Sequence, residues 1–185
     1  MCIHPYLSPT HPKNAQVLIV EGWLPDAAME KAAIEFKKHG YKYCISTGGP
    51  IECGYFLTGY KNFAQLGALT LRKLGIDSSL VYPVNADFVE KDRTFASALS
   101  VNAWLIKTSR MDSVFNLFSI GCHAKRSHLL FTKVLGKRCS IGIISCEDDS
   151  YDKKHWWRSS SGVRDVIGET IAYCYGVIFF LFKSS

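Results

Sequence analysis

Short apolar segments alternate with longer segments of helical periodicity along most of the chain. The apolar segments are rich in β-branched and aromatic residues, and the four residues at 17–20 are all apolar, as in a strand buried on both faces. The expected strands cover residues 16–21, 41–46, 80–84, 113–119 and 139–145. The expected helices cover residues 26–39, 63–74, 94–109, 123–135 and about 162–182. This alternation predicts an α/β fold with a parallel sheet of about five strands and helices on both of its faces.

The ends of the expected helices carry capping signals. Asp26 is expected to cap the first helix, and Gly40, Gly75 and Gly136 stand where a left-handed residue would end the first, second and fourth helices. No internal repeat or low-complexity tract divides the chain. We therefore expect one domain over residues 15–185, after a proline-containing lead-in segment at 1–14.

The end of the chain is strongly apolar. The run at 171–182 is shorter than the roughly 20 residues that a membrane span needs. We interpret it as part of a buried terminal helix, with association at a membrane interface as the alternative.

Composition and charge narrow the classes of partner. The 185 residues are 48% hydrophobic and 21% charged, which is the balance of a compact globular protein. The formal net charge is +6, and the basic residues are scattered in pairs, which argues against nucleic acid and favours an anionic small molecule. The 7 cysteines form no Cys-x-x-Cys pair, and an odd number cannot close a full set of disulfides. We therefore expect a reducing, cytoplasmic environment.

Polar and glycine-rich loops follow four of the expected strands. The carboxyl ends of parallel strands meet at one edge of the sheet, where α/β proteins bind their ligands, so we expect these loops to form one site. The candidate ligand-binding residues in them are Gly22, Trp23, Thr47, Gly48, Gly49, Asp92, Arg93, Thr94, Ser119, Lys125 and Arg126. The glycines at 48 and 49 let the backbone approach a ligand closely, although an ordinary turn has the same composition.

The turn after the fourth expected strand is the sharpest of these signals. A helix amino terminus carries a partial positive charge that disfavours further cations, yet His123, Lys125 and Arg126 all lie in this first turn. A bound anion would reverse the penalty, because backbone N–H groups and the side chains would then face a negative charge. The alternative is a solvated basic turn capped by Ser119 or Gly121.

Other residues near these loops have two interpretations each. Glu21 ends an apolar strand and is the best carboxylate for a base or hydroxyl acceptor, while Trp23 would stack on a ligand ring; an ordinary ion pair and a core tryptophan are the alternatives. Arg158 follows two tryptophans and precedes three serines, and we expect it to face a ligand. The alternative for this segment is that both tryptophans pack within the protein and a serine caps the next helix.

The start of the third expected helix offers a second anion contact. Arg93 and Thr94 supply a cation and a hydroxyl there, and Asp92 either joins the site or caps the helix. The chain has neither the three-glycine dinucleotide fingerprint nor a Walker loop. His123 and His128 are five positions apart and point in different directions on a helix, so we expect no metal.

These loops, in this order, resemble the YdcF/SanA/ElyC family of bacterial α/β proteins over roughly residues 15–182. The resemblance is carried by the opening at 17–26, by Thr-Gly-Gly at 47–49 in place of the family's Ser-Gly-Gly, by Arg-Thr at 93–94 in place of its Asn-Thr, and by 119–127, which matches its His-x-x-Arg stretch. The resemblance implies a Rossmann-like three-layer sandwich and a ligand pocket at the strand ends. It also implies S-adenosylmethionine as a ligand or cofactor and a role in envelope or peptidoglycan-related processes.

Together these features predict a protein that binds an anionic small molecule, such as a nucleotide-like compound, S-adenosylmethionine or a phosphate-bearing compound. If it is an enzyme of envelope metabolism, His123 is the expected acid or base, tuned by Glu21. Acidic residues usual in the family correspond here to Phe63 and Ala96, so binding is better supported than catalysis.

A non-catalytic, envelope-associated interaction module is the alternative function. It would use the tryptophans at 156–157 and the apolar tail. Some members of the family carry an amino-terminal membrane anchor, so membrane association is the alternative to a cytoplasmic location.

Overall fold

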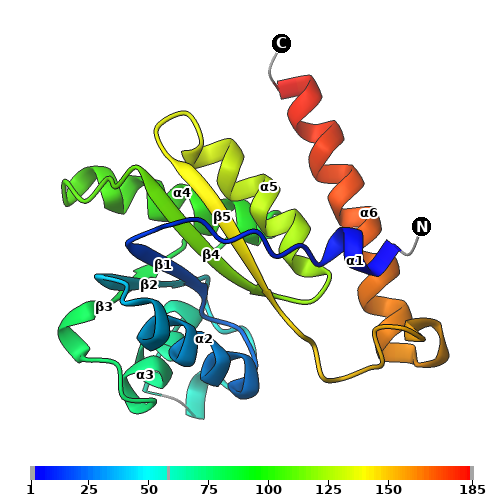
Figure 1. Ribbon diagram of the computed structural model, residues 1–185, viewed down its shortest axis with the longest axis horizontal. Helices are drawn as coiled ribbons and strands as arrows, with labels where there is room; N and C mark the ends of the chain where they lie inside the picture. The colour runs from blue at the N-terminus through cyan, green and yellow to red at the C-terminus, as the bar shows by residue number, and fades with distance from the viewer. Residues whose placement is uncertain (1–2, 58, 184–185) are drawn as a thin grey trace.

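The computed structural model describes residues 3–57 and 59–183 and has a five-stranded parallel sheet at its centre (Figure 1). The strand order is β3-β2-β1-β4-β5, which places β1 in the middle. The strands are β1 (Val17–Glu21), β2 (Tyr43–Gly48), β3 (Val81–Asn85), β4 (Val114–Ile120) and β5 (Ser140–Cys146). The helices are α1 (Ile3–Leu7), α2 (Asp26–His39), α3 (Phe63–Lys73), α4 (Arg93–Lys107), α5 (His123–Leu135) and α6 (Ser160–Lys183). Short 3-10 turns occur at η1 (Tyr55–Leu57), η2 (Ser78–Leu80) and η3 (Trp156–Arg158).

Helices cover both faces of the sheet, which confirms the predicted Rossmann-like α/β sandwich. All five residues of β1 are buried, and their side chains alternate between the two faces. Val17 and Ile19 belong to one core cluster with residues of α4 and α5, whereas Leu18 and Val20 belong to another with residues of α2 and α3. The uninterrupted apolar run of β1 therefore has a physical cause, because neither face of this strand meets water.

The predicted ends of the elements agree with the structure to within two residues, but two of the predicted caps do not. Gly40 ends α2 in the left-handed conformation, with φ of 62°, as predicted. The helix itself begins at Asp26, so its N-cap is Pro25 and the predicted cap at Asp26 is wrong. Gly136 is right-handed, with φ of −66°, because its N–H still bonds to the carbonyl of Thr132, 2.8 Å away.

The lead-in segment forms part of the fold. Residue His11 pairs in antiparallel fashion with Ile143 of the edge strand β5. The buried amide of Asn116 holds the segment in place: its oxygen accepts from the Lys13 N–H at 2.8 Å, and its nitrogen donates to the Lys13 carbonyl at 2.9 Å. The segment thus covers backbone groups that an edge strand would otherwise leave open to other chains.

The last helix departs from the prediction of a buried terminal helix. α6 packs against α5 outside the three layers, and the part near the C-terminus projects from the body of the molecule (Figure 1). Ile167, Ile171 and Ile178 remain 47%, 65% and 52% exposed. An apolar sequence on all sides of a helix predicts burial, but among the described residues α6 packs against α1, α5 and η3 and leaves the side with these isoleucines exposed. Within the described part of the chain, no helix is long and apolar enough to cross a membrane.

Candidate functional site

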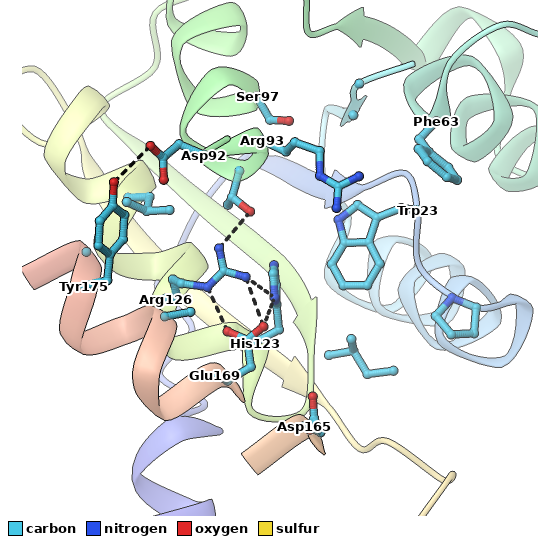
Figure 2. A pocket seen from close by; sticks show the side chains of 18 of the residues that line it. Trp23, Phe63, Asp92, Arg93, Ser97, His123, Arg126, Asp165, Glu169 and Tyr175 are labelled. Atoms are coloured by element: carbon cyan, nitrogen blue, oxygen red, sulfur yellow. Dashed lines mark hydrogen bonds and ion pairs between the residues drawn. The ribbon is translucent and has the colours of Figure 1, made fainter. Parts of the chain in front are cut away.

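A pocket of about 740 Å³ opens at the carboxyl edge of the sheet (Figure 2). Loops after β1, β2, β3 and β5 line it together with the first turns of α4 and α5, and α6 forms the opposite wall. The structure brings together eight of the predicted site residues in its lining: Trp23, Gly48, Gly49, Asp92, Arg93, Thr94, His123 and Arg126. The pocket lies where the topology of a parallel sheet places ligand sites.

Six predicted site residues do not line this pocket: Glu21, Gly22, Thr47, Ser119, Lys125 and Arg158. Lys125 points away because it is two positions from His123 on a helix, and its ammonium group lies 4.5 Å from the centre of the Tyr6 ring. Arg158 is exposed at the end of η3. Neither cation is placed to contact a ligand in the pocket, contrary to the prediction.

Two of the six residues, Gly22 and Thr47, pack between the sheet and its loops. A Cβ atom on Gly22 would lie 2.2 Å from the carbonyl oxygen of Phe63, so this glycine permits close contact between the loop after β1 and the start of α3. Thr47 is buried, and its hydroxyl donates to the carbonyl of Val84 at 3.0 Å. Both residues act in packing and do not face the cavity.

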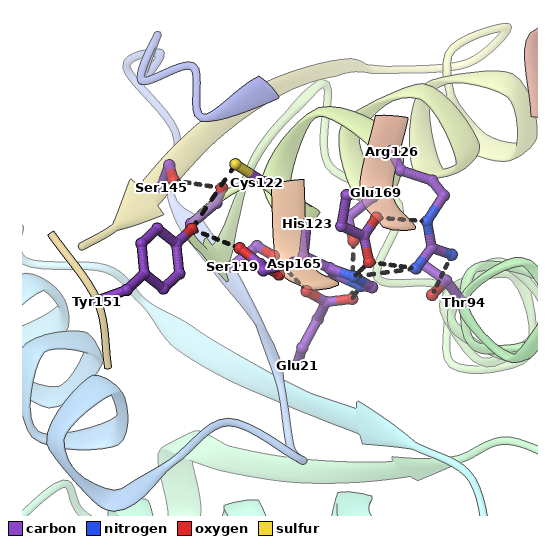
Figure 3. A network of polar contacts seen from close by, with 12 residues as sticks. Glu21, Thr94, Ser119, Cys122, His123, Arg126, Ser145, Tyr151, Asp165 and Glu169 are labelled. Carbon is purple, nitrogen blue, oxygen red and sulfur yellow. Dashed lines mark hydrogen bonds and ion pairs between the residues drawn. The ribbon is translucent and has the colours of Figure 1, made fainter. Parts of the chain in front are cut away.

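Glu21 lies beneath His123 and is only 2% exposed (Figure 3). Its carboxylate accepts hydrogen bonds from Ser119 at 2.5 Å and Ser127 at 2.9 Å, and it lies 3.4 Å from Nε2 of His123. Burial disfavours the charge on Glu21, but the neighbouring His123 and the hydrogen bonds lower the pKa of this carboxyl below its usual value. Glu21 therefore supports His123 and does not reach a ligand itself, in contrast to the role of direct base that the sequence suggested.

Two of the three cations of the basic turn, His123 and Arg126, face a carboxylate of the protein. Glu169, on α6, accepts from Nδ1 of His123 at 2.8 Å and from Nε and Nη2 of Arg126 at 2.8 and 3.0 Å (Figure 2). The three side chains are at most 20% exposed. The negative charge expected at this turn thus comes from the last helix. Sequence reasoning missed Glu169.

The protonation of this cluster follows from its contacts. Burial alone would lower the pKa of His123, but Glu21 and Glu169 outweigh that effect and raise it to about 9. Burial would raise the pKa of Glu169, but hydrogen bonds and charges from His123 and Arg126 lower it to about 2. At neutral pH the cluster therefore contains an imidazolium and a guanidinium against two carboxylates.

Trp23 covers the imidazolium from the side of the cavity. The two ring centres are 4.8 Å apart and nearly perpendicular, and Trp23 is 37% exposed. Nε2 of His123 is buried and has no hydrogen-bond partner among the described residues, although Glu21 attracts it across 3.4 Å. The indole therefore packs against the charged ring, and both side chains contribute to the lining of the pocket.

Carboxylates that the sequence did not single out also line the pocket. Asp148 comes from the loop after β5, and Asp165 comes from α6 together with Glu169. Asp165 and Glu169 are four positions apart, so one side of a largely apolar helix carries both of them. The four-residue spacing of these two carboxylates is visible in the sequence and indicates a charged side of the helix. It does not identify the residues that this side contacts.

Asp165 also contacts Tyr151, whose hydroxyl in turn contacts the buried thiol of Cys122. The phenol of Tyr151 donates to Asp165 at 2.5 Å and lies 3.8 Å from the sulfur of Cys122. Burial, Asp148 and Glu169 raise the pKa of Asp165, although the bond from Tyr151 opposes them. Burial likewise raises the pKa of Cys122 to about 12, so this thiol is not a reactive nucleophile at neutral pH.

Arg93 is the accessible cation at the edge of the pocket. Its side chain is 69% exposed, and its ion pair with Glu52 is long, at 3.4 Å, with Glu52 59% exposed. Gly49 lies nearby in the lining, and a Cβ atom there would meet nothing within 4 Å. Glu90 and Asp92 also line the pocket beside Arg93, so this side is open and carries charges of both signs, whereas the charges that α6 contributes are carboxylates.

The chain matches no known family model, no curated protein and no solved structure at a significant level. The resemblance to the YdcF/SanA/ElyC family therefore rests on the motifs alone and stays a prediction. Among the residues that the structure describes, no group of three or more His, Cys, Asp or Glu side chains is placed to hold a metal ion. The fold and the site define an α/β protein with an open pocket of mixed charge at the carboxyl ends of its strands.

Proposed function

We propose that this protein binds a small molecule with an anionic group in the pocket at the carboxyl edge of the sheet. The observation that carries the proposal is the position of Arg93. It is the first residue of α4, it lines the pocket, and its side chain is 69% exposed with only a long ion pair to Glu52. An anion there would meet a guanidinium and the positive end of a helix at once.

The remainder of the ligand is proposed to carry a planar ring. Trp23 lines the same pocket and exposes part of its indole, and aromatic rings pack favourably against one another. Nucleotides and S-adenosylmethionine combine such a ring with an anionic group, and sugar phosphates supply the anion alone. The family resemblance supports S-adenosylmethionine and a role in envelope metabolism.

In this proposal, His123 and Arg126 form the inner wall of the pocket and are not its free anion contacts. Glu169 already accepts hydrogen bonds from both side chains. If the protein has catalytic activity, His123 is the candidate acid, because a pKa of about 9 keeps it protonated at neutral pH. Glu21 and Glu169 are then positioning residues, since each contacts the imidazole.

A thermal-shift screen tests the proposal on the whole chain. The probes are AMP, S-adenosylmethionine, glucose 6-phosphate and a short polyprenyl phosphate, because a ligand that binds the folded state raises the melting temperature by mass action. For any probe that stabilises the protein, Arg93→Ala should weaken binding by about tenfold or more, the effect of losing a charge-assisted hydrogen bond.

Arg158→Ala is the matched control, because it removes an exposed arginine that does not line the pocket. Its affinity for the probe should equal that of the wild type. Equal affinities of the Arg93 variant and the wild type would contradict the proposed site, and so would the absence of any shift with all four probes.

A further inference from the structure

The exposed side of α6 carries a continuous row of apolar side chains. Ile167, Ile171, Tyr175 and Ile178 are 47%, 65%, 51% and 52% exposed, and their spacing of three or four residues places them on one side of the helix. We call this row the α6 ridge. Contiguous apolar surface of this kind on a protein marks a contact with another molecule or with a membrane.

The charges around the α6 ridge are unevenly placed: the exposed Asp92 lies beside Tyr175, 3.5 Å from its hydroxyl, and cations lie at the N-terminal end of the ridge. Among the described residues of α6, the exposed charged side chain is Arg164, one turn before the ridge. The carboxylates of the helix, Asp165 and Glu169, line the pocket instead. The preceding turn η3 adds an exposed cation and a half-exposed aromatic, Arg158 and Trp157. The ridge is thus apolar along its length and cationic at its N-terminal end.

A second copy of the chain does not suit this surface. Four half-exposed side chains supply only a few hundred Å², whereas a stable complex buries about 800 Å² on each partner. In a parallel pair of α6 helices, Arg164 would face its own copy. In an antiparallel pair, it would lie against apolar residues of the other ridge. Both arrangements place a charge where it has no partner.

We propose that the α6 ridge binds the surface of an anionic lipid bilayer, with the helix lying in the interfacial plane. The isoleucines would enter the boundary between headgroups and acyl chains, while Arg158 and Arg164 would meet lipid phosphates. Trp157 adds a side chain type that favours this interface. The net charge of +6 adds long-range attraction to an anionic surface.

This contact would place the pocket beside the membrane surface. Tyr175 belongs to the ridge and also lines the pocket, and its hydroxyl lies 3.5 Å from Asp92. The inference goes beyond the proposed ligand binding and does not depend on it, because the surface contact needs the outer side of α6 and ligand binding needs the cavity.

Vesicle sedimentation with the full chain tests the proposal. We expect the protein to sediment with vesicles of equal parts phosphatidylglycerol and phosphatidylcholine, and much less with phosphatidylcholine alone. Ile171→Glu should reduce binding to the mixed vesicles by about tenfold or more, because a carboxylate would then have to enter the apolar boundary near anionic lipid. Ile34→Glu is the matched control: Ile34 is 63% exposed on α2, compared with 65% for Ile171, and its variant should bind as the wild type does.

A second variant tests the charges. The double variant Arg158→Gln, Arg164→Gln should lose most of the preference for phosphatidylglycerol, and high salt should have the same effect on the wild type. Melting curves of all variants check that the fold is intact. The proposal is overturned if the wild type does not sediment with anionic vesicles, or if Ile171→Glu and Ile34→Glu bind equally. A wild type that is dimeric by analytical ultracentrifugation, with a monomeric Ile171→Glu variant, would also overturn it by assigning the ridge to a second copy.

Discussion

The ion cluster between α5 and α6 should contribute a measurable share of the stability of the protein. The perturbation is Glu169→Gln, which keeps the size of the side chain but removes its charge. In the structure this carboxylate accepts three hydrogen bonds, at 2.8, 2.8 and 3.0 Å, from His123 and Arg126. The variant would leave a guanidinium and an imidazolium close together, with Glu21 as the carboxylate that still lies within 3.4 Å of the imidazole.

The size of the effect follows from the protonation of Glu169. A pKa of about 2 in the folded protein, compared with the ordinary 4.5, corresponds to about 3 kcal/mol in favour of the charged form in the folded state. The side chain is 15% exposed, so solvent screens it little. Removing one partner of a buried ion pair costs about 3–5 kcal/mol in other proteins, and glutamine keeps part of the hydrogen bonding. We therefore expect the free energy of unfolding of Glu169→Gln to fall by about 3 kcal/mol at pH 6.

The loss should depend on pH in a defined direction. The pKa of Glu169 is lower in the folded state, so its contribution is complete above pH 4.5 and is lost as pH falls towards 2. The pKa of His123 is higher in the folded state, so its contribution is complete below pH 6.5 and is lost as pH rises through about 9. The difference between wild type and variant should thus be largest between about pH 4.5 and 6.5. The two contributions share the same contacts and do not add.

Urea unfolding of the wild type and variant across this pH range provides the measurement. Glu52→Gln is the control, because Glu52 pairs with Arg93 across 3.4 Å while both side chains are exposed, and such pairs contribute about 0–1 kcal/mol. NMR titration of His123 should give a pKa near 9 in the wild type and a lower one in the Glu169 variant. Equal losses in the Glu169 and Glu52 variants, or a loss that does not shrink at low pH, would refute the role assigned to the cluster.

Two further predictions concern packing and thiol reactivity. Gly22→Ala should lower the free energy of unfolding by at least about 2 kcal/mol, because the new Cβ would lie 2.2 Å from the Phe63 carbonyl oxygen. Gly49→Ala is the control, because the space at that position is open, and it should change the free energy of unfolding by less than about 0.5 kcal/mol. Equal stability of the two variants in urea unfolding would contradict the close packing at Gly22. A thiol reagent should label the exposed Cys53 rapidly and leave Cys122 unreacted until the protein unfolds, because Cys122 is buried and its pKa is raised to about 12. Mass spectrometry of the labelled peptides measures the extent of labelling at each cysteine. Early labelling of Cys122 would show that the interior opens more easily than the packing implies.

The layers of the fold were predictable because the information for them is local. The apolar positions of β1 alternate between two covered faces, and the amphipathic pattern of α2 and the left-handed glycine at its end are features of single segments. The same local rules placed Trp23, Arg93 and His123 at the carboxyl edge of the sheet, because strand direction and strand ends follow from the order of the elements.

The sequence alone determined the α/β fold, the edge of the sheet that carries the pocket and most of the residues from the first four strand ends. Only the tertiary structure decided what neutralises Arg126 and His123: the partner is Glu169, 43 positions from Arg126 along the chain. It also decided that α6 turns its carboxylates towards the cavity and leaves the α6 ridge exposed. The physical reason is that hydrophobic periodicity reports which side of a segment avoids water, whereas a charge is stabilised by whichever opposite charge packing brings within a few ångströms.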